Sequence, residues 1–412
     1  MQETPKANRL HIALFGRRNA GKSSLINALT NQELAVVSEI PGTTTDPVFK
    51  AMEILPIGPC MIIDTAGIDD VGTLGQLRVK KTREVLNQTD LALVLIDATV
   101  GVTDFELDLK AEIGAKKIPI IGVVNKTDLS TVDLAALEKA FGLPLVEVSA
   151  QNRTGIGTLK ERIILNAPFD FEEPHILGDL INPGDVCVLV VPIDLAAPKG
   201  RLILPQVQTI RDILDNDAIT MVVKERELRE ALGRLNGKPR IVVTDSQAFL
   251  KVAADTPNDV MMTSFSILFA RHKGDLLELV RGARAIDNLR PGDRVLIAEA
   301  CTHHRQADDI GRVQIPRWLR QYVGGELQFD FSSGTGYPEN LEDYKLVVHC
   351  GGCMINRRQM LYRIQQAVER EVPIVNYGVL LAFVHGILAR ALDPFPRAKQ
   401  IYLAEDKEEA AI

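Results

Sequence analysis

Short apolar runs alternate with amphipathic stretches over roughly the first 170 residues of the chain. Runs rich in β-branched or aliphatic side chains, separated by helical patterns, are typical of parallel strands that helices bury on both faces. The pattern therefore predicts an α/β domain with a parallel sheet. The expected strands are Leu10–Phe15, Met61–Asp64, Leu91–Asp97, Ile118–Asn125 and Leu145–Ser149.

The same alternation resumes after residues 168–183, a stretch of Phe, acidic, Pro and Gly residues without periodicity that we interpret as a linker. We expect three α/β domains, at 1–170, 180–265 and 266–412, and the second and third are the smaller parallel-sheet domains. The second shows no phosphate loop or convergent polar cluster, which favours a structural or dimerisation module. The expected strands are Val186–Val191, Ile219–Val223, Arg240–Val243, Val260–Phe269, Val295–Ala300, Leu327–Phe331, Lys345–His349 and Val372–Asn376, with a helix over Asn356–Arg370.

Bulk composition narrows the class of protein. The 412 residues are 46% hydrophobic and 25% charged, with a formal net charge of −7, so overall charge favours neither a nucleic-acid nor a membrane partner. No apolar run reaches the roughly 18 residues that a membrane span needs. The polar N-terminus lacks the apolar core of a signal peptide, and we expect a cytoplasmic protein. Its five cysteines are then reduced thiols or metal ligands.

A phosphate-binding loop follows the first expected strand. The segment Gly16-Arg-Arg-Asn-Ala-Gly21-Lys22-Ser23 matches G-x-x-x-x-G-K-[ST]. Its glycines let successive backbone N–H groups surround phosphates, the lysine neutralises the β and γ oxygens, and the serine hydroxyl can ligate Mg²⁺. The expected nucleotide-binding residues here are Gly16, Asn19, Ala20, Gly21, Lys22, Ser23 and Ser24.

Two segments complete the expected phosphate and magnesium site. Asp64-Thr-Ala-Gly67 ends an apolar strand, where the carboxylate can hold Mg²⁺ through water and the glycine amide can meet the γ-phosphate. Between these motifs lies Pro41-Gly-Thr-Thr-Thr-Asp46, in the position of a first switch loop. Thr44 is the expected second hydroxyl on Mg²⁺, with Thr43 and Thr45 as alternatives. We expect Lys22, Thr44, Asp64 and Gly67 to act in catalysis, and Ser23, Thr44 and Asp64 to hold magnesium.

Two further strand ends select the base. In Asn125-Lys-Thr-Asp128 the Asp128 carboxylate can accept both N–H protons at guanine N1 and the exocyclic amine, a pattern that adenine does not offer. Ser149-Ala150 ends the next strand and can close the base pocket. Four motifs in this order predict a P-loop fold that binds and hydrolyses GTP. The expected base-side residues are Asn125, Lys126, Asp128, Ser149 and Ala150.

This N-terminal pattern resembles the Era-like branch of the translation-factor-type GTPases, which includes members acting in tRNA modification and ribosome assembly. In that branch an asparagine placed like Asn19 commonly helps to bind K⁺, whose charge substitutes for an arginine finger. Ile68 follows Asp-x-x-Gly where Ras-like proteins carry a catalytic glutamine. We therefore expect slow intrinsic hydrolysis that depends on Mg²⁺ and is stimulated by K⁺; a hydrogen-bonded loop cap is the alternative role for Asn19.

The last third of the chain concentrates metal-ligand chemistry. Cys301-Thr-His303 and His349-Cys350-Gly-Gly-Cys353 both follow expected strands, and ligands of open α/β sheets lie at such strand ends. Cys-x-x-Cys brings two thiolates within reach of one metal centre. A tetrahedral zinc with Cys₃His ligation and an iron–sulfur cluster held by three thiolates both suit the pattern. A redox pair is the further alternative.

The two signatures together resemble the FeFe-hydrogenase maturation GTPases over essentially the whole chain. The resemblance implies GTPase, dimerisation and cluster-binding domains, a homodimer, and a 4Fe–4S cluster held by Cys301, Cys350 and Cys353. His303 and His349 match the motif histidines, as labile or outer-shell ligands. It also implies a scaffold that accepts the diiron subcluster of the hydrogenase cofactor from two radical-SAM maturases and delivers it to apo FeFe-hydrogenase. The alternative is an Era-like GTPase of tRNA modification or ribosome assembly with structural zinc.

Overall fold

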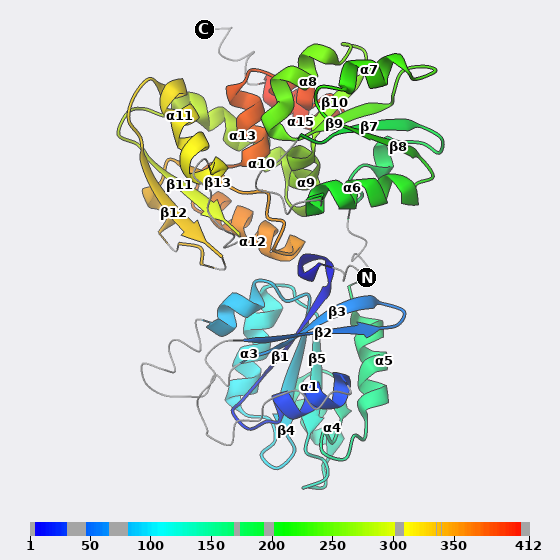
Figure 1. Cartoon of the computed structure of the whole chain (residues 1–412). Coiled ribbons are helices and arrows are strands. Elements are labelled where there is room, and N and C mark those ends of the chain that lie inside the picture. The colour runs from blue at the N-terminus through cyan, green and yellow to red at the C-terminus, as the bar shows by residue number, and fades with distance from the viewer. Residues whose placement is uncertain are drawn as a thin grey trace. The chain divides into compact units, whose positions relative to one another are not determined.

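The computed structural model describes residues 5–30, 47–65, 81–168, 174–192, 202–300, 309–334, 336–338 and 340–404. The chain divides into two compact units, Met1–Glu172 and Glu173–Ile412. Figure 1 shows α/β architecture in both. Within the described ranges, no helix combines the length and the apolar character needed to cross a bilayer.

The first unit is built on a six-stranded sheet. Its elements are β1 (Leu10–Gly16), α1 (Lys22–Thr30), β2 (Val48–Ile54), β3 (Gly58–Asp64), β4 (Leu91–Asp97), α3 (Asp104–Ala115), β5 (Ile120–Asn125), α4 (Leu134–Phe141), β6 (Leu145–Glu147) and α5 (Ile156–Asn166). The strand order is β2-β3-β1-β4-β5-β6, in which only β2 runs antiparallel to its neighbour. Alternate residues of β1 point to opposite faces. Ile12 packs with α1 and α5 on one face, whereas Phe15 packs with α3 and α4 on the other.

The second unit holds two four-stranded sheets. The first part comprises β7 (Val186–Val190), α6 (Leu204–Asp215), β8 (Ile219–Val223), α7 (Leu228–Gly233), β9 (Ile241–Thr244), α8 (Phe249–Asp255), β10 (Met261–Ser264) and α9 (Phe265–Lys273). The second comprises α10 (Leu276–Arg284), β11 (Arg294–Glu299), α11 (Ile315–Val323), β12 (Gln328–Ser333), β13 (Leu346–His349), α12 (Arg357–Val368), β14 (Ile374–Asn376), α13 (Tyr377–Val384), α14 (Leu388–Ala391) and α15 (Pro396–Ala404). The sheets are ordered β10-β9-β7-β8 and β12-β11-β13-β14. Every strand pair in both is parallel.

One hydrophobic cluster joins the two sheets of the second unit. It includes Val188 and Val243 of the first sheet and Ile297 and Val347 of the second, all fully buried. The predicted α/β class, with a P-loop-type sheet followed by parallel sheets, is confirmed. The boundaries at 170, 180 and 265 remain predictions.

The expected strand Val260–Phe269 is wrong in its second half. Strand β10 ends at Ser264, whose side chain accepts a hydrogen bond from the backbone N–H of Ile267 and caps helix α9. Because a short apolar run does not distinguish a buried strand from a buried helix, the hydrophobic pattern alone missed this change. Strand β10 lies at one end of the sheet order and is therefore an edge strand.

Candidate functional site

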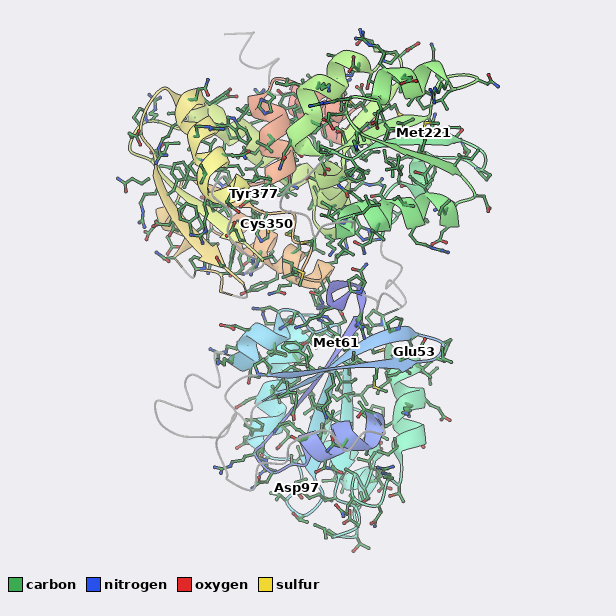
Figure 2. All side chains as sticks on the ribbon, in the orientation of Figure 1. Glu53, Met61, Asp97, Met221, Cys350 and Tyr377 are labelled. Atoms are coloured by element: carbon green, nitrogen blue, oxygen red, sulfur yellow. The ribbon has the colours of Figure 1, made fainter. Side chains whose placement is uncertain are left out.

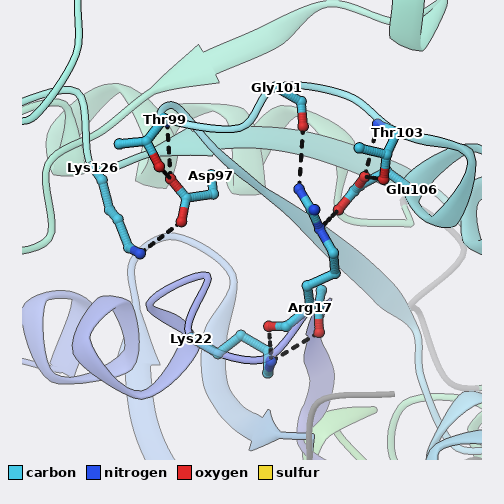
Figure 3. Close-up of polar contacts among 9 residues, drawn as sticks. Arg17, Lys22, Asp97, Thr99, Gly101, Thr103, Glu106 and Lys126 are labelled. Atoms are coloured by element: carbon cyan, nitrogen blue, oxygen red, sulfur yellow. Dashed lines mark hydrogen bonds and ion pairs between the residues drawn. The ribbon is translucent and has the colours of Figure 1, made fainter. Parts of the chain in front are cut away.

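The expected phosphate loop connects β1 to α1, the strand–loop–helix context that the motif requires. Lys22 is buried, and its Nζ donates to the carbonyl oxygens of Gly16 at 2.8 Å and Arg17 at 2.7 Å (Figure 3). Gly21 has φ +87°, and a Cβ there would lie 2.2 Å from Nδ2 of Asn125. A side chain at position 21 is therefore excluded by both strain and contact.

The expected magnesium ligands Ser23 and Asp64 lie together. Asp64 ends β3, and the Ser23 hydroxyl donates to its Oδ2 at 2.6 Å. Burial raises the pKa of Asp64, while the Ser23 hydrogen bond and the charges of Lys22 and Lys50 act in the opposite direction. A partly desolvated carboxylate beside a hydroxyl is a set of hard oxygen donors that suits Mg²⁺. Thr44 and Gly67 lie outside the described residues.

Asn125 connects the phosphate loop to the base side. It is buried at the end of β5, its Nδ2 donates to the Ala20 carbonyl at 3.0 Å, and its Oδ1 accepts from the Ala150 N–H at 3.1 Å. The Ser149 hydroxyl donates to the exposed Asp128 carboxylate. Three sequence motifs therefore meet at one edge of the sheet.

Two ion pairs that the sequence analysis missed support this edge (Figure 3). Arg17 of the phosphate loop donates through Nε to Oε1 of Glu106 at 2.7 Å, and the Glu106 side chain is fully buried. Nζ of Lys126 lies 2.6 Å from Oδ2 of Asp97, which is the last residue of β4. Burial alone would raise the pKa of the Asp97 carboxyl. Hydrogen bonds from Lys126 and Thr99 outweigh burial and hold that pKa below its usual value.

Glu106 has a local sequence signal, but its partner does not. Thr103-x-x-Glu106 has the sequence of a capping box at the start of α3, and both the backbone N–H and the hydroxyl of Thr103 donate to Oε2 of Glu106. That pattern predicts a helix start, not contact with Arg17 in a loop more than eighty residues earlier. Only the fold brings the two together.

Strands β11 and β13, which precede the two cysteine motifs in the sequence, are neighbours in one sheet. They pair in parallel with Ala298 opposite His349. The N–H of Cys350 donates to the Ala298 carbonyl at 2.9 Å, and the N–H of Ala300 donates to Sγ of Cys350 at 3.1 Å. Ala300 immediately precedes Cys301 in the sequence, so the backbone that leads into Cys301 contacts the Cys350 sulfur. Cys301 and His303 themselves lie outside the described residues.

The loop between Cys350 and Cys353 is anchored at its far end. Gly352 has φ +63°, and a Cβ there would lie 2.4 Å from Cε of Met360. Lys273, at the end of α9, is 1% exposed, and its Nζ donates to the carbonyls of Cys353 at 3.3 Å and Ile355 at 3.2 Å. Figure 2 labels Cys350, which follows β13, and Tyr377, which follows the neighbouring strand β14.

His349 is fully buried, and both of its ring nitrogens have protein partners. Nε2 lies 3.0 Å from Nη1 of Arg363, and Nδ1 lies 2.7 Å from the Cys350 carbonyl. A guanidinium only donates, so Nε2 accepts and Nδ1–H donates to the carbonyl. These two contacts fix the orientation of the His349 ring beside Cys350. No sequence signal marks Arg363, because an arginine in an amphipathic helix normally faces solvent.

The other two cysteines lie in the core. Cys60 and Cys187 are fully buried, and burial raises the pKa of their thiols, to about 11 and about 12. Neutral thiols of this kind are poor metal ligands. Within the described part of the chain, which omits Cys301 and His303, no group of three or more His, Cys, Asp or Glu side chains could hold a metal ion.

Three protein-family models match the chain. The hydrogen maturase F dimerization domain matches residues 176–274, and the hydrogen maturase F tetramerization domain matches residues 277–394. The third, described as a 50S ribosome-binding GTPase, matches residues 11–126. The first unit is thus a GTPase domain.

Curated relatives match between a third and two fifths of the chain. The tRNA modification GTPase MnmE of Desulforamulus reducens is 37% identical over 158 residues, covering 37% of this chain and 34% of that protein. GTPase Der of Wolinella succinogenes is 33% identical over 175 residues, covering 40% of this chain and 37% of that protein. The chain therefore spans about a third of the length of the curated relatives it matches.

Two solved structures are similar at low TM-score. Era of Aquifex aeolicus bound to GDP.AlF4⁻ gives a TM-score of 0.36 at 19% identity, covering 60% of this chain and 99% of that chain. The G domain of the T. maritima iron transporter FeoB gives 0.31 at 26% identity, covering 39% of this chain and 99% of that chain.

Proposed function

The chain belongs to the hydrogen maturase F family, whose two models together span more than half of its length, and on that premise we propose a GTP-hydrolysing scaffold for FeFe-hydrogenase maturation. The scaffold binds a 4Fe–4S cluster and assembles or transfers the diiron subcluster to apo FeFe-hydrogenase. One observation carries the cluster part of the proposal: the Ala300 N–H reaches the Cys350 sulfur at the ends of two paired strands.

At the nucleotide site, Lys22 binds the β and γ phosphate oxygens, and Asp128 reads the guanine edge. Ser23 and Asp64 hold Mg²⁺ together with Thr44, and the ion supplies positive charge where the transition state develops negative charge. Asn19, exposed and at φ +62°, is the proposed K⁺ ligand. Hydrolysis should be faster in K⁺ than in Na⁺ at equal ionic strength; equal rates would remove this role for Asn19.

At the cysteine site, Cys350 and Cys353 are proposed to bind iron together with Cys301. Backbone N–H groups directed at cluster sulfurs stabilise the thiolate form and adjust the reduction potential, and the Ala300 N–H is such a donor. Three protein thiolates leave the fourth iron of the cluster with an exchangeable ligand. His303 is a candidate for that ligand or for a group that contacts it. The diiron unit, supplied by two radical-SAM maturases, would dock there as cargo. Nucleotide turnover would then time the exchange of these partners.

Anaerobic reconstitution tests the proposal. We expect a brown protein with a reducible 4Fe–4S EPR signal that is lost in Cys301→Ala, Cys350→Ala and Cys353→Ala. Cys187→Ala is the control, because this buried cysteine lies on β7 in the other sheet of the second unit, and the variant should keep the EPR signal. A colourless wild type with stoichiometric zinc would instead support a GTPase of tRNA modification or ribosome assembly.

The dimer is proposed to form through β8. Strand β8 is an edge strand of its sheet. The exposed fractions of Ile219 and Val222 on this strand are 54% and 43%. An apolar edge strand is a template for pairing with a second copy, and the matching family model is named for dimerization. Val222→Lys should give a monomer in light scattering, whereas Leu165→Lys, at a still more exposed apolar position of the first unit, should not. An unchanged mass for Val222→Lys would contradict the β8 interface.

A further inference from the structure

A fully buried arginine lies behind the cysteine loop. Arg363, on the inner face of α12, is 1% exposed. Its Nη1 contacts Nε2 of His349 at 3.0 Å, and its Nη2 donates to the Gly334 carbonyl at 2.6 Å. The guanidinium lies 5.2 Å from the ring centroid of Tyr337. All of these partners are formally neutral.

Among the residues that the structure describes, no carboxylate lies within ion-pair distance of Arg363. Burying an unpaired charge costs several kcal/mol in proteins, so such a cation normally has an anionic partner. Burial lowers the pKa of Arg363, and electrostatic contact with Cys350 and Tyr337 opposes that effect. Of these two, only the cysteine becomes an anion when it binds a metal.

We propose that Arg363 is the built-in counter-charge of the metal-bound cysteine site and, through His349, a positioning residue for Cys350. This inference rests on the proposed cluster function and specifies the charge of the ligand that the site accepts. Three thiolates outweigh the charge of an oxidised 4Fe–4S core, and one-electron reduction makes the assembly more negative. A fixed cation nearby stabilises that assembly, and the reduced form most. By donating to Nε2, Arg363 also fixes the His349 tautomer whose Nδ1–H bonds the Cys350 carbonyl.

The experiment compares reduction potentials of the anaerobically reconstituted full chain, titrated with dithionite and followed by EPR. Arg363→Gln should retain the cluster and shift its potential to more negative values. We expect at least a tenfold change in the reduction equilibrium, which is about 59 mV for a one-electron couple. Arg363→Lys keeps the charge and should stay within about threefold of wild type, since the cation is retained.

A matched control separates charge from structure. Arg357, six residues earlier on the same helix, donates to the carbonyls of His272 and Gly274 rather than toward the cysteines. Arg357→Gln should lower thermal stability without moving the potential. An unchanged potential in Arg363→Gln, or an equal shift in Arg357→Gln, would overturn the proposal.

A second variant decides between the outcomes if Arg363→Gln does not fold. Tyr337→Glu places a carboxylate beside the retained arginine and should shift the potential in the same negative direction, while Tyr337→Gln should not. Equal potentials for the two Tyr337 variants contradict the counter-charge role. A wild-type chain that takes up no iron contradicts the proposed function, and this inference with it. A cluster-loaded wild type with unshifted variants contradicts the inference alone.

Discussion

The ion pairs that support the nucleotide site and the buried arginine behind the cysteine site are balanced in opposite ways. At the nucleotide site, Arg17 pairs with Glu106 and Lys126 pairs with Asp97, each within 2.7 Å. At the cysteine site, Arg363 meets a neutral imidazole and a carbonyl oxygen. The two ion pairs are electrically complete within the protein, so the loops that they hold are preorganised for a nucleotide that binds and dissociates. The charge of Arg363 is completed, on our proposal, by an anion that stays.

The first prediction tests whether the two sites work separately. Lys22→Ala removes the cation expected to face the β and γ phosphates and should slow GTP hydrolysis on the order of a thousandfold. Iron content and the EPR signal should remain at the wild-type level. Lys139→Ala, on the exposed side of α4, is the control and should change neither. A parallel loss of iron in Lys22→Ala would show that the sites depend on each other.

The second prediction concerns acid, and it uses a buried histidine of the first unit. His11 lies between the carbonyls of Gln88 and Lys6, and burial, which outweighs those contacts, lowers its pKa to about 4. As pH falls below about 6.5 the unfolded chain takes up the proton first. The first unit should therefore keep its full stability above about pH 6.5 and lose about 3 kcal/mol as pH falls to about 4.

Two signals report the units separately in that measurement. The sole tryptophan, Trp318, lies on α11, so its fluorescence reports the unfolding of the second unit. Binding of a fluorescent GTP analogue reports the folded state of the first unit. In urea unfolding at several pH values, the free energy of unfolding should fall steeply with falling pH only when it is measured by the GTP-analogue signal. His11→Gln should weaken this pH dependence of stability. If the variant keeps the wild-type pH dependence, the acid sensitivity belongs to other groups.

The third and smallest effect tests the compensated charges. Glu106→Gln leaves Arg17 without its carboxylate and should lower the free energy of unfolding of the first unit by about 2 kcal/mol, since Arg17 is partly exposed. Glu112→Gln removes an exposed partner of Arg83 from the same helix, and about 0.5 kcal/mol or less is expected. Equal losses in the two variants would contradict a special role for the Arg17–Glu106 pair.

The fold class was predictable because parallel strands buried on both faces appear as continuous apolar runs. Strand β2 escaped notice, since it is a half-exposed edge strand with Lys50 and Glu53 among its apolar residues. The motif at Gly21 was visible because a phosphate loop is built from consecutive residues. The helix over Asn356–Arg370 was also expected, and α12 begins after the capping residue Asn356.

The supporting charges were not predictable from the sequence. Arg363 lies fourteen residues after His349, and Lys273 donates to a carbonyl eighty residues later in the chain. Neither periodicity nor composition records which polar side chain a fold turns inward. Local rules identify the loops that bind a ligand, whereas the residues that hold those loops follow only from tertiary packing.

Lys273 also has a consequence for how this part of the chain can be divided. It lies at the end of the range matched by one family model, yet its ammonium caps carbonyls in the range matched by the next. A polypeptide cut at residue 274 would lose those acceptors together with much of the apolar interior that the two ranges share. The two ranges are therefore expected to be inherited, expressed and purified as one piece.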